Sequence, residues 1–128
     1  MTHSFPVTVY YEDTDMGGIV YHANYLKFIE RARSTWVAEM GVDQLALKEA
    51  GLVFVVHRIE ADFLAPATLG DALNVQSHVD QATAARWELR QEVLRGGERL
   101  FSALVTIVTM DARGRPTRLP AELRRATT

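Results

Sequence analysis

The sequence predicts an α+β protein in which a curved antiparallel sheet of about five strands wraps around one long helix. Apolar residues alternate with a period of two near the N-terminus and through most of the chain after Gly51. Between about residues 22 and 40 the period is instead that of a helix. A single amphipathic helix must bury its apolar face, and a curved sheet can cover it. With 128 residues, no linker-like stretch and no repeat, the chain is expected to form one domain, 1–128.

In the N-terminal half we expect a strand, a long helix and a short helix, in that order. The stretch "FPVTVYYE" (residues 5–12) alternates apolar and polar side chains as a strand does. The long helix should end at Gly41. The stretch "VDQLALKEAG" predicts a short helix with Asp43 as its cap and Gly51 at its end.

The remaining chain predicts four strands that meander antiparallel, followed by a short terminal helix in "LPAELRRA". One face of each strand is apolar and the other is polar, except in "LFSALVTIVTM", which is apolar on both faces as an interior strand would be. "RGGE" predicts a tight hairpin at Gly96–Gly97. The strands are expected near residues 53–63, 73–79, 85–93 and 100–110. Exposed strand edges favour dimerisation from edge to edge.

Composition excludes several classes of protein. The chain has no cysteine, which rules out disulfides and thiolate-rich metal sites and is compatible with a reducing compartment. Its formal net charge of −2 gives no general attraction to nucleic acid. Neither a signal peptide nor an apolar run of membrane-spanning length is present. We therefore expect a soluble cytoplasmic domain that neither binds nucleic acid nor inserts into a membrane.

The segment "YYEDTDMGGIVYHANYLKFIERAR", residues 10–33, carries more polar and flexible residues ahead of the long helix than the start of a helix needs. One capping residue usually suffices there. This segment instead contains two aspartates, a pair of glycines and a histidine: Asp13, Asp15, Gly17, Gly18 and His22. The excess points to chemistry at the helix N-terminus.

This segment resembles the signature segment of hotdog-fold acyl-CoA thioesterases, specifically the Tol-Pal-associated type within the 4-hydroxybenzoyl-CoA thioesterase family. The resemblance continues more loosely through "VFVVHRIEADFLAPATLGDALNV" and the final strand. It implies dimers that share a continuous sheet, and often homotetramers. It also implies hydrolysis of a thioester without metal or cofactor. The expected substrates are short-chain or aromatic acyl-CoA, or the same acyl groups on acyl carrier protein.

The resemblance places the family's catalytic aspartate at Asp15 and its thioester-polarising backbone amide at His22. Thioester hydrolysis needs a carboxylate that attacks the carbonyl or activates water, and donors that hold the developing oxyanion. The first turn of a helix supplies free N–H groups and the positive end of the helix dipole. Whether the aspartate acts as nucleophile or general base stays open. Substrate contacts are expected from Gly17 and Gly18, which allow close backbone approach, and from Tyr21 and Tyr25.

Other interpretations compete with these assignments. Asp13 is expected to cap a turn rather than to catalyse. A metal site is weakly supported because no second histidine stands at a suitable spacing from His22. An acyl-thioester dehydratase and a non-catalytic hotdog scaffold protein remain as alternative functions.

Three further side-chain assignments concern the rest of the chain. Arg33 lies within the apolar arc of the long helix, where we expect it to form a partly buried ion pair with Glu30 at a subunit contact, and a pocket-lining role is the alternative. His57 is expected to be a core or interface histidine. The C-terminal arginines of "DARGRPTRLPAELRRA" are expected to form a solvated face, with clamping of coenzyme A phosphates as the alternative.

Overall fold

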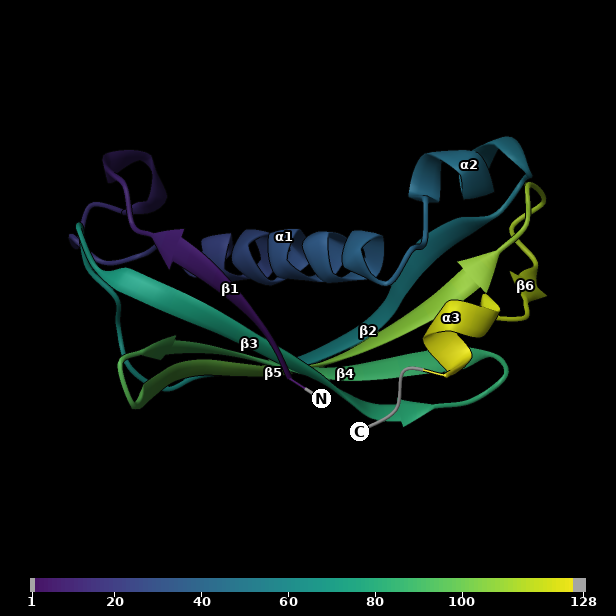
Figure 1. Cartoon of the computed structure of the whole chain (residues 1–128). Coiled ribbons are helices and arrows are strands. Elements are labelled where there is room, and N and C mark those ends of the chain that lie inside the picture. Colours follow the sequence, from purple (N-terminus) through teal and green to yellow (C-terminus); the bar gives the residue numbers. More distant parts are fainter. Residues whose placement is uncertain (1, 126–128) are drawn as a thin grey trace.

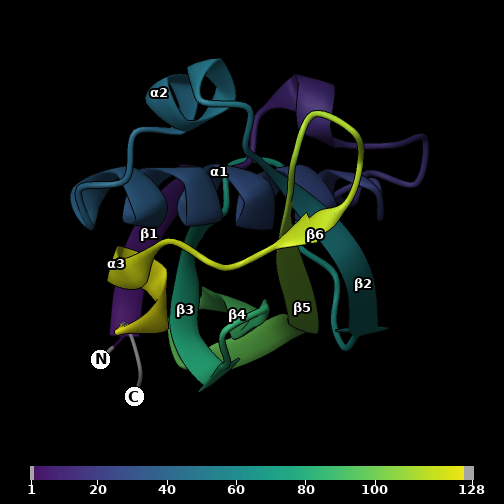
Figure 2. The same cartoon turned by 90° about the vertical axis from the view of Figure 1, so that its right-hand side faces the viewer.

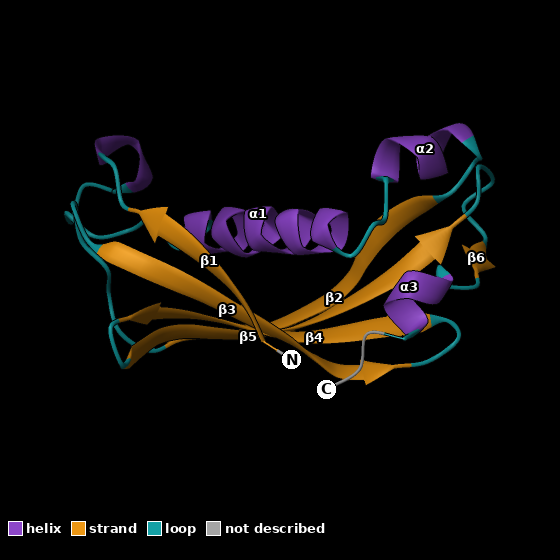
Figure 3. Ribbon diagram, in the orientation of Figure 1, coloured by secondary structure: helices purple, strands orange, loops and turns teal. Residues whose placement is uncertain are grey.

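The computed structural model describes residues 2–125 and confirms the α+β class, with a curved antiparallel sheet around one long helix (Figures 1 and 3). The helical elements are η1 (Tyr11–Asp13), α1 (Asn24–Glu39), α2 (Gln44–Glu49) and α3 (Ala121–Arg124). The strands are β1 (Thr2–Thr8), β2 (Val53–Phe63), β3 (Ala72–Ala82), β4 (Arg86–Arg95), β5 (Glu98–Met110) and β6 (Pro116–Thr117). None of the helices within residues 2–125 is long and apolar enough to cross a lipid bilayer.

The strand order is β1-β3-β4-β5-β2, with the short β6 paired to the end of β5. The prediction of four meandering strands was therefore wrong for β2, which pairs with β5 instead of with the strand that follows it. Pairing runs from Val53 opposite Met110 to Phe63 opposite Phe101. The predicted hairpin at Gly96–Gly97 is confirmed, because Arg95 and Glu98 face each other across it. This order makes β2 an edge strand.

Helix α1 lies against one face of the sheet, which curves around it, and α2 lies on the far side of α1 (Figure 2). The helix buries the arc that its sequence period predicts, including Tyr25, Ile29, Ala32 and Trp36. The sheet supplies the other half of the core from the alternating positions of β3, β4 and β5. Trp87 of β4 packs 5.6 Å from the ring of Trp36. The helix and the sheet both contribute apolar side chains to this core, so burial of these side chains is the main favourable contribution to folding.

Two predicted boundaries were wrong at the N-terminal segment. The first strand runs over Thr2–Thr8 rather than residues 5–12, because its partner strand begins at Ala72, opposite Thr8. The chain then turns into η1, where the Asp13 side chain accepts a hydrogen bond from the Tyr10 amide. The regular α-helix begins at Asn24 rather than at residue 22.

The other predicted elements agree more closely with the structure. Asp43 caps α2, because its carboxylate accepts a hydrogen bond from the Ala46 amide at 3.1 Å. Gly41 and Gly51 follow α1 and α2 with positive φ. The terminal helix forms over Ala121–Arg124, and residue 126 of the predicted span lies outside the described residues. β6 was not predicted.

His57 lies in a bulge of β2, between Val56 and Arg58, and is exposed. The expectation of a core position was therefore wrong. The bulge shifts the register of the edge strand, so an alternation counted from the sequence changes face at this point. Its expected role at an interface stays a prediction.

Candidate active site

Asp15 lies in an exposed turn ahead of α1, and the backbone around it fixes its position. Its Oδ1 accepts a hydrogen bond of 2.9 Å from the Gly17 amide. Its own amide donates to the Ile19 carbonyl at 2.9 Å, and its carbonyl accepts from the Gly18 amide at 3.0 Å. Gly18 has a φ of 79°, which favours glycine. The turn therefore presents a carboxylate to solvent with one of its oxygens already held.

Asp13 has the capping role that the sequence predicted. It is buried, and its Oδ2 accepts a hydrogen bond of 2.8 Å from the Tyr10 amide. Its carbonyl accepts from the Tyr21 amide and from the side-chain amide of Asn24, both at 2.9 Å. These bonds attach the turn to the start of α1. The Asp13 carboxylate is therefore held within the turn, and the absence of a catalytic role for it stays a prediction.

The helix start leaves two backbone donors free. The chain winds in 3₁₀-type turns just before and into α1, so the Asn24 amide donates to the Tyr21 carbonyl and the Tyr25 amide to the His22 carbonyl. In residues 2–125, neither His22 nor Ala23 donates its N–H to a protein acceptor. Such orphan amides carry the positive end of the helix dipole. They are suited to hold a developing negative charge.

A cavity of about 310 Å³ opens beside the His22 side chain. The imidazole lies 6.0 Å from the ring of Phe63, edge to face, and 4.6 Å from that of Tyr21. The cavity is lined mainly by apolar side chains from the end of β2, the loop after it and the start of α1: Ile19, Val20, Tyr25, Phe63, Leu64, Ala65 and Pro66. Ile19 links this cavity to the Asp15 turn, because its carbonyl accepts a hydrogen bond from the Asp15 amide.

Tyr25 forms the floor of this region rather than an open contact surface. It is only 4% exposed and stacks on Phe101, with 5.0 Å between the ring centroids and 7° between the planes. Its hydroxyl accepts a hydrogen bond of 3.3 Å from the Ala67 amide. Burial raises the pKa of this phenol, so it stays neutral at physiological pH. A substrate contact from Tyr25 stays a prediction.

The loop after β2 is anchored to the same segment through its backbone. The Ala67 carbonyl accepts a hydrogen bond of 2.9 Å from the Val20 amide, and Thr68 forms an isolated β-bridge with Ile19. Asp71 holds this loop from the other side, since its Oδ2 accepts from the Thr68 amide and from Arg95, both at 2.8 Å. The cavity wall is thus fastened to the Asp15 turn.

The structure assembles all six predicted site residues around one end of α1. Asp15, Gly17 and Gly18 form the exposed turn, and His22 and Tyr25 line the cavity. Tyr21 is half exposed and packs against His22. In the described chain no hydrogen bond joins Asp15 to His22. The six positions are neighbours, but their catalytic and binding roles stay predictions.

The C-terminal arginines lie elsewhere in this chain. β6 and α3 flank the C-terminal end of α1, whereas residues 10–22 lie at its N-terminal end (Figure 1). Within this segment Arg115 pairs with Asp111 at 3.1 Å, and Arg124 donates to the Leu119 carbonyl at 3.0 Å. These contacts agree with a solvated face, and they do not place the arginines beside Asp15 of the same chain.

The predicted Arg33–Glu30 ion pair was wrong. Arg33 instead donates a hydrogen bond of 3.0 Å from Nη1 to Oε1 of Gln91, a fully buried residue of β4. Gln91 has an inward position in β4, where its neighbours at alternate positions are apolar. That break in the alternation was a readable signal for a buried polar contact. The structure forms no ion pair of Arg33 within residues 2–125.

Sequence reasoning also missed Asn24 and Ala67, which hold the site together. The sequence did carry a signal for Asn24, because an asparagine near the start of a helix commonly forms a hydrogen bond with the backbone. Ala67 acts only through its backbone amide and carbonyl, so its side chain gave no signal. In the described residues, no three His, Asp or Glu side chains come together as a metal site would require. Metal independence stays a prediction.

Comparison with known proteins agrees with this geometry. A curated acyl-CoA thioesterase YbgC from Haemophilus influenzae is 39% identical over 125 residues, covering 96% of this chain and 92% of that protein. The acyl-CoA thioester hydrolase YbgC of an Escherichia coli strain is 36% identical over 121 residues, covering 93% and 90%. The crystal structure of a probable thioesterase from Bartonella henselae superposes with a TM-score of 0.89 at 36% identity, covering 94% of this chain and all of that one.

A 1,4-dihydroxy-2-naphthoyl-CoA thioesterase from Synechocystis superposes with a TM-score of 0.90 at 25% identity, covering 98% and 95% of the two chains. The helix wrapped by its sheet, together with these relatives, defines a thioester hydrolase of the hotdog fold. A family model described as the thioesterase-like superfamily matches residues 9–127, and the chain belongs to this superfamily.

Proposed function

We propose that this protein hydrolyses the thioester of short-chain or aromatic acyl-CoA, with Asp15 as the catalytic carboxylate and the His22 amide as the oxyanion donor. The observation that carries the proposal is the pairing of an exposed, backbone-held carboxylate with free helix-start amides beside an apolar cavity. The names of the relatives support acyl-CoA as the carrier. Acyl groups on acyl carrier protein are a second substrate form.

Two reaction courses fit this arrangement. As a general base, Asp15 accepts a proton from water while the water oxygen attacks the carbonyl carbon. As a nucleophile, the carboxylate attacks the same carbon and forms a mixed anhydride, which water then hydrolyses. In both courses the carbonyl oxygen gains negative charge that the free amides stabilise, and the C–S bond then breaks. The products are a carboxylic acid and the coenzyme A thiol.

The substrate preference follows from the cavity beside His22. Its walls are apolar and include the rings of Phe63 and Tyr25, which suits a small aliphatic or aromatic acyl group. Phe63 is about half exposed, so its ring is available to a ligand. The length of acyl chain that is accepted depends on which groups close the outer end of this cavity.

We also propose a homo-oligomer, either a dimer or a dimer of dimers, in the cytoplasm. Within residues 2–125, β2 pairs only through one edge, with β5. Its eleven residues include exposed Val53, Val56 and Phe63, and a long apolar edge favours pairing with a second copy. Light scattering at micromolar protein should give a multiple of 14.3 kDa, and a monomer mass would contradict this part of the proposal.

Thiol release from a panel of acyl-CoA substrates tests the activity. Acetyl-, butyryl-, hexanoyl-, benzoyl- and palmitoyl-CoA should be compared with and without EDTA. We expect hydrolysis of the short-chain or aromatic members, undiminished by EDTA. Release from none of them would contradict the proposal, and so would activity that disappears on chelation and returns with zinc. Hydration or dehydration of an acyl chain without thiol release would favour the dehydratase alternative.

A further inference from the structure

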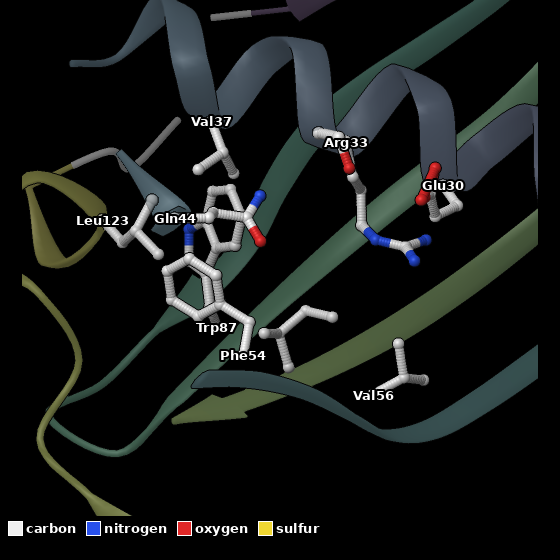
Figure 4. Close-up of a pocket in the computed structure, with 10 residues that line it drawn as sticks. Glu30, Arg33, Val37, Gln44, Phe54, Val56, Trp87 and Leu123 are labelled. Atoms are coloured by element: carbon white, nitrogen blue, oxygen red, sulfur yellow. The ribbon is translucent and has the colours of Figure 1, made fainter. Parts of the chain in front are cut away.

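A second cavity, of about 220 Å³, lies under the C-terminal half of α1 (Figure 4). Arg33 and Glu30 stand at one end of it, whereas Val37, Phe54 and Leu123 gather at the other with Trp87. None of its lining residues lines the cavity beside His22. Eleven positions separate His22 from Arg33, which is about 16 Å along a helix. The two cavities are separate places in this chain.

The charged end of this second cavity holds Arg33, which forms no salt bridge with another of the described residues, although the nearby charge of Glu30 acts to raise its pKa. The Arg33 side chain extends from α1 toward the sheet (Figure 4), and it forms no ion pair with any of residues 2–125. Its described partner is the neutral amide oxygen of Gln91. Burial lowers the pKa of Arg33, but an arginine remains charged at neutral pH. A half-buried guanidinium has five donors, so capacity remains for an anion.

Gln91 fixes the direction of this guanidinium. Its amide nitrogen donates to the Ile29 carbonyl and to the Ser77 hydroxyl, both at 2.9 Å. These two bonds determine which way the amide faces, so its oxygen points to Arg33. The residue is fully buried, and it has no freedom to release the arginine to solvent at low cost. Arg33 is therefore held in place before any ligand arrives.

Trp87 forms part of the apolar end of the cavity. Trp87 is 1% exposed, and its buried Nε1–H has no hydrogen-bond acceptor among residues 2–125. The body of a ligand bound at this end would lie beside the indole, so the Trp87 N–H can report on binding.

We propose that this cavity binds a small organic carboxylate with a ring-sized apolar body. A carboxylate matches the planar fork of the arginine, and the apolar walls accept the body. A cavity of about 150 Å³ is enough for benzene, so this one holds a body of that size with its head group. Glu30 stands exposed at the same rim, which disfavours a doubly charged phosphate.

This proposal is independent of the proposed catalysis at Asp15. The carboxylic acid released by a thioesterase belongs to the same chemical class as this ligand, so the cavity could respond to product. Binding can be measured on the unmodified, assembled protein without any turnover. A failure of one proposal therefore leaves the other standing.

Benzoate titration, followed by NMR of the tryptophan indole N–H groups and by calorimetry, tests the site. The indole signals of Trp36 and Trp87 are assigned from the Trp36→Phe and Trp87→Phe variants. We expect saturable binding that moves the Trp87 signal. Benzamide, which has the same shape without charge, should bind at least about tenfold more weakly, since it cannot form the charge-assisted hydrogen bonds that a carboxylate forms with Arg33.

Variants then locate the bound anion. Arg33→Met should weaken benzoate at least about tenfold, and Arg33→Lys should weaken it less, because it keeps the charge and loses the fork. Asp15→Asn should leave the affinity unchanged. Circular dichroism and gel filtration confirm that each variant folds and assembles. Four results would overturn the proposal: no binding by the assembled wild type, an unmoved Trp87 signal, equal binding of benzamide, or loss of affinity in Asp15→Asn.

Discussion

The Gly17 amide donates a hydrogen bond of 2.9 Å to Oδ1 of Asp15, so the glycine pair does more than turn the chain. A Cβ built on Gly17 would meet that same oxygen at 3.2 Å, which is closer than ordinary packing allows. At Gly18, the next residue, a Cβ would meet nothing within 4 Å. The first glycine therefore accommodates the carboxylate, and the second accommodates the backbone.

This difference predicts that two matched variants lose different properties. Gly17→Ala should lower kcat roughly tenfold or more, because the carboxylate must move and small displacements of a reacting group are costly. Gly18→Ala should instead cost about 1–2 kcal/mol of stability, since its φ of 79° is strained for alanine. Acyl-CoA kinetics and thermal unfolding separate the two. Equal loss of kcat in both variants would argue against the assignment.

The two aspartates of the segment should also behave differently. Asp15→Asn keeps the side-chain volume and removes the charge needed for attack or proton acceptance, so we expect at least about a 10²-fold loss of turnover. Asp13→Asn should lose much less activity. It should mainly destabilise the turn, because the Asp13 carboxylate accepts a hydrogen bond from the Tyr10 amide. Kinetics on both folded variants provide the test. An inactive Asp13→Asn beside an active Asp15→Asn would show that the catalytic residue was misassigned.

Local sequence patterns predicted most of this fold because they record which side chains are buried. The periods of two and 3.6 located α1 and the long strands, and Gly41 marked the end of α1. The position of β2 beside β5 could not be predicted in this way. It depends on pairing between residues about fifty positions apart, which no local pattern contains. The bulge at His57 also belongs to this long-range pairing, and it reverses the alternation of β2 at a point that no local pattern marks.

The candidate site was predictable where it rests on side-chain chemistry and unpredictable where it rests on backbone. Asp15 and the glycine pair stood out by residue type. Ala67 holds the cavity wall through its amide and carbonyl, which every residue carries. Arg33 was assigned to Glu30 because both lie on one helix, but its true partner Gln91 comes from a strand 58 residues away.

The hydrogen bond from Ala67 to the Tyr25 hydroxyl leads to a stability prediction. Tyr25→Phe keeps the stack on Phe101 and removes the acceptor, which leaves a buried amide unpaired at a cost of about 1–3 kcal/mol. We expect Tm to fall by several degrees, and KM to rise because Ala67 anchors the loop that lines the cavity. Tyr21→Phe is the control for stability, since Tyr21 is half exposed. An unchanged Tm in Tyr25→Phe would contradict the proposed anchor.

The last prediction concerns acid and the loop that Asp71 holds. Hydrogen bonds from the Thr68 amide and from Arg95 hold the pKa of Asp71 below the usual value of aspartate. A carboxylate with a lowered pKa stabilises the folded state above its unfolded pKa of about 3.9. That contribution is lost as pH falls through the lower folded pKa. Asp71→Asn should therefore be less stable than wild type at pH 6, and the difference should shrink toward pH 3.

Denaturant unfolding of wild type and Asp71→Asn at intervals between these pH values measures this change. Asp62→Asn is a suitable control, because Asp62 is exposed on β2 and its carboxylate accepts no hydrogen bond from residues 2–125. The control measures what the loss of a surface carboxylate alone does to stability over the same pH range. Because Thr68 bridges to Ile19, acid should also loosen the cavity wall beside the Asp15 turn. A difference between wild type and Asp71→Asn that stays constant from pH 6 to pH 3 would show that the charge of Asp71 does not hold this loop.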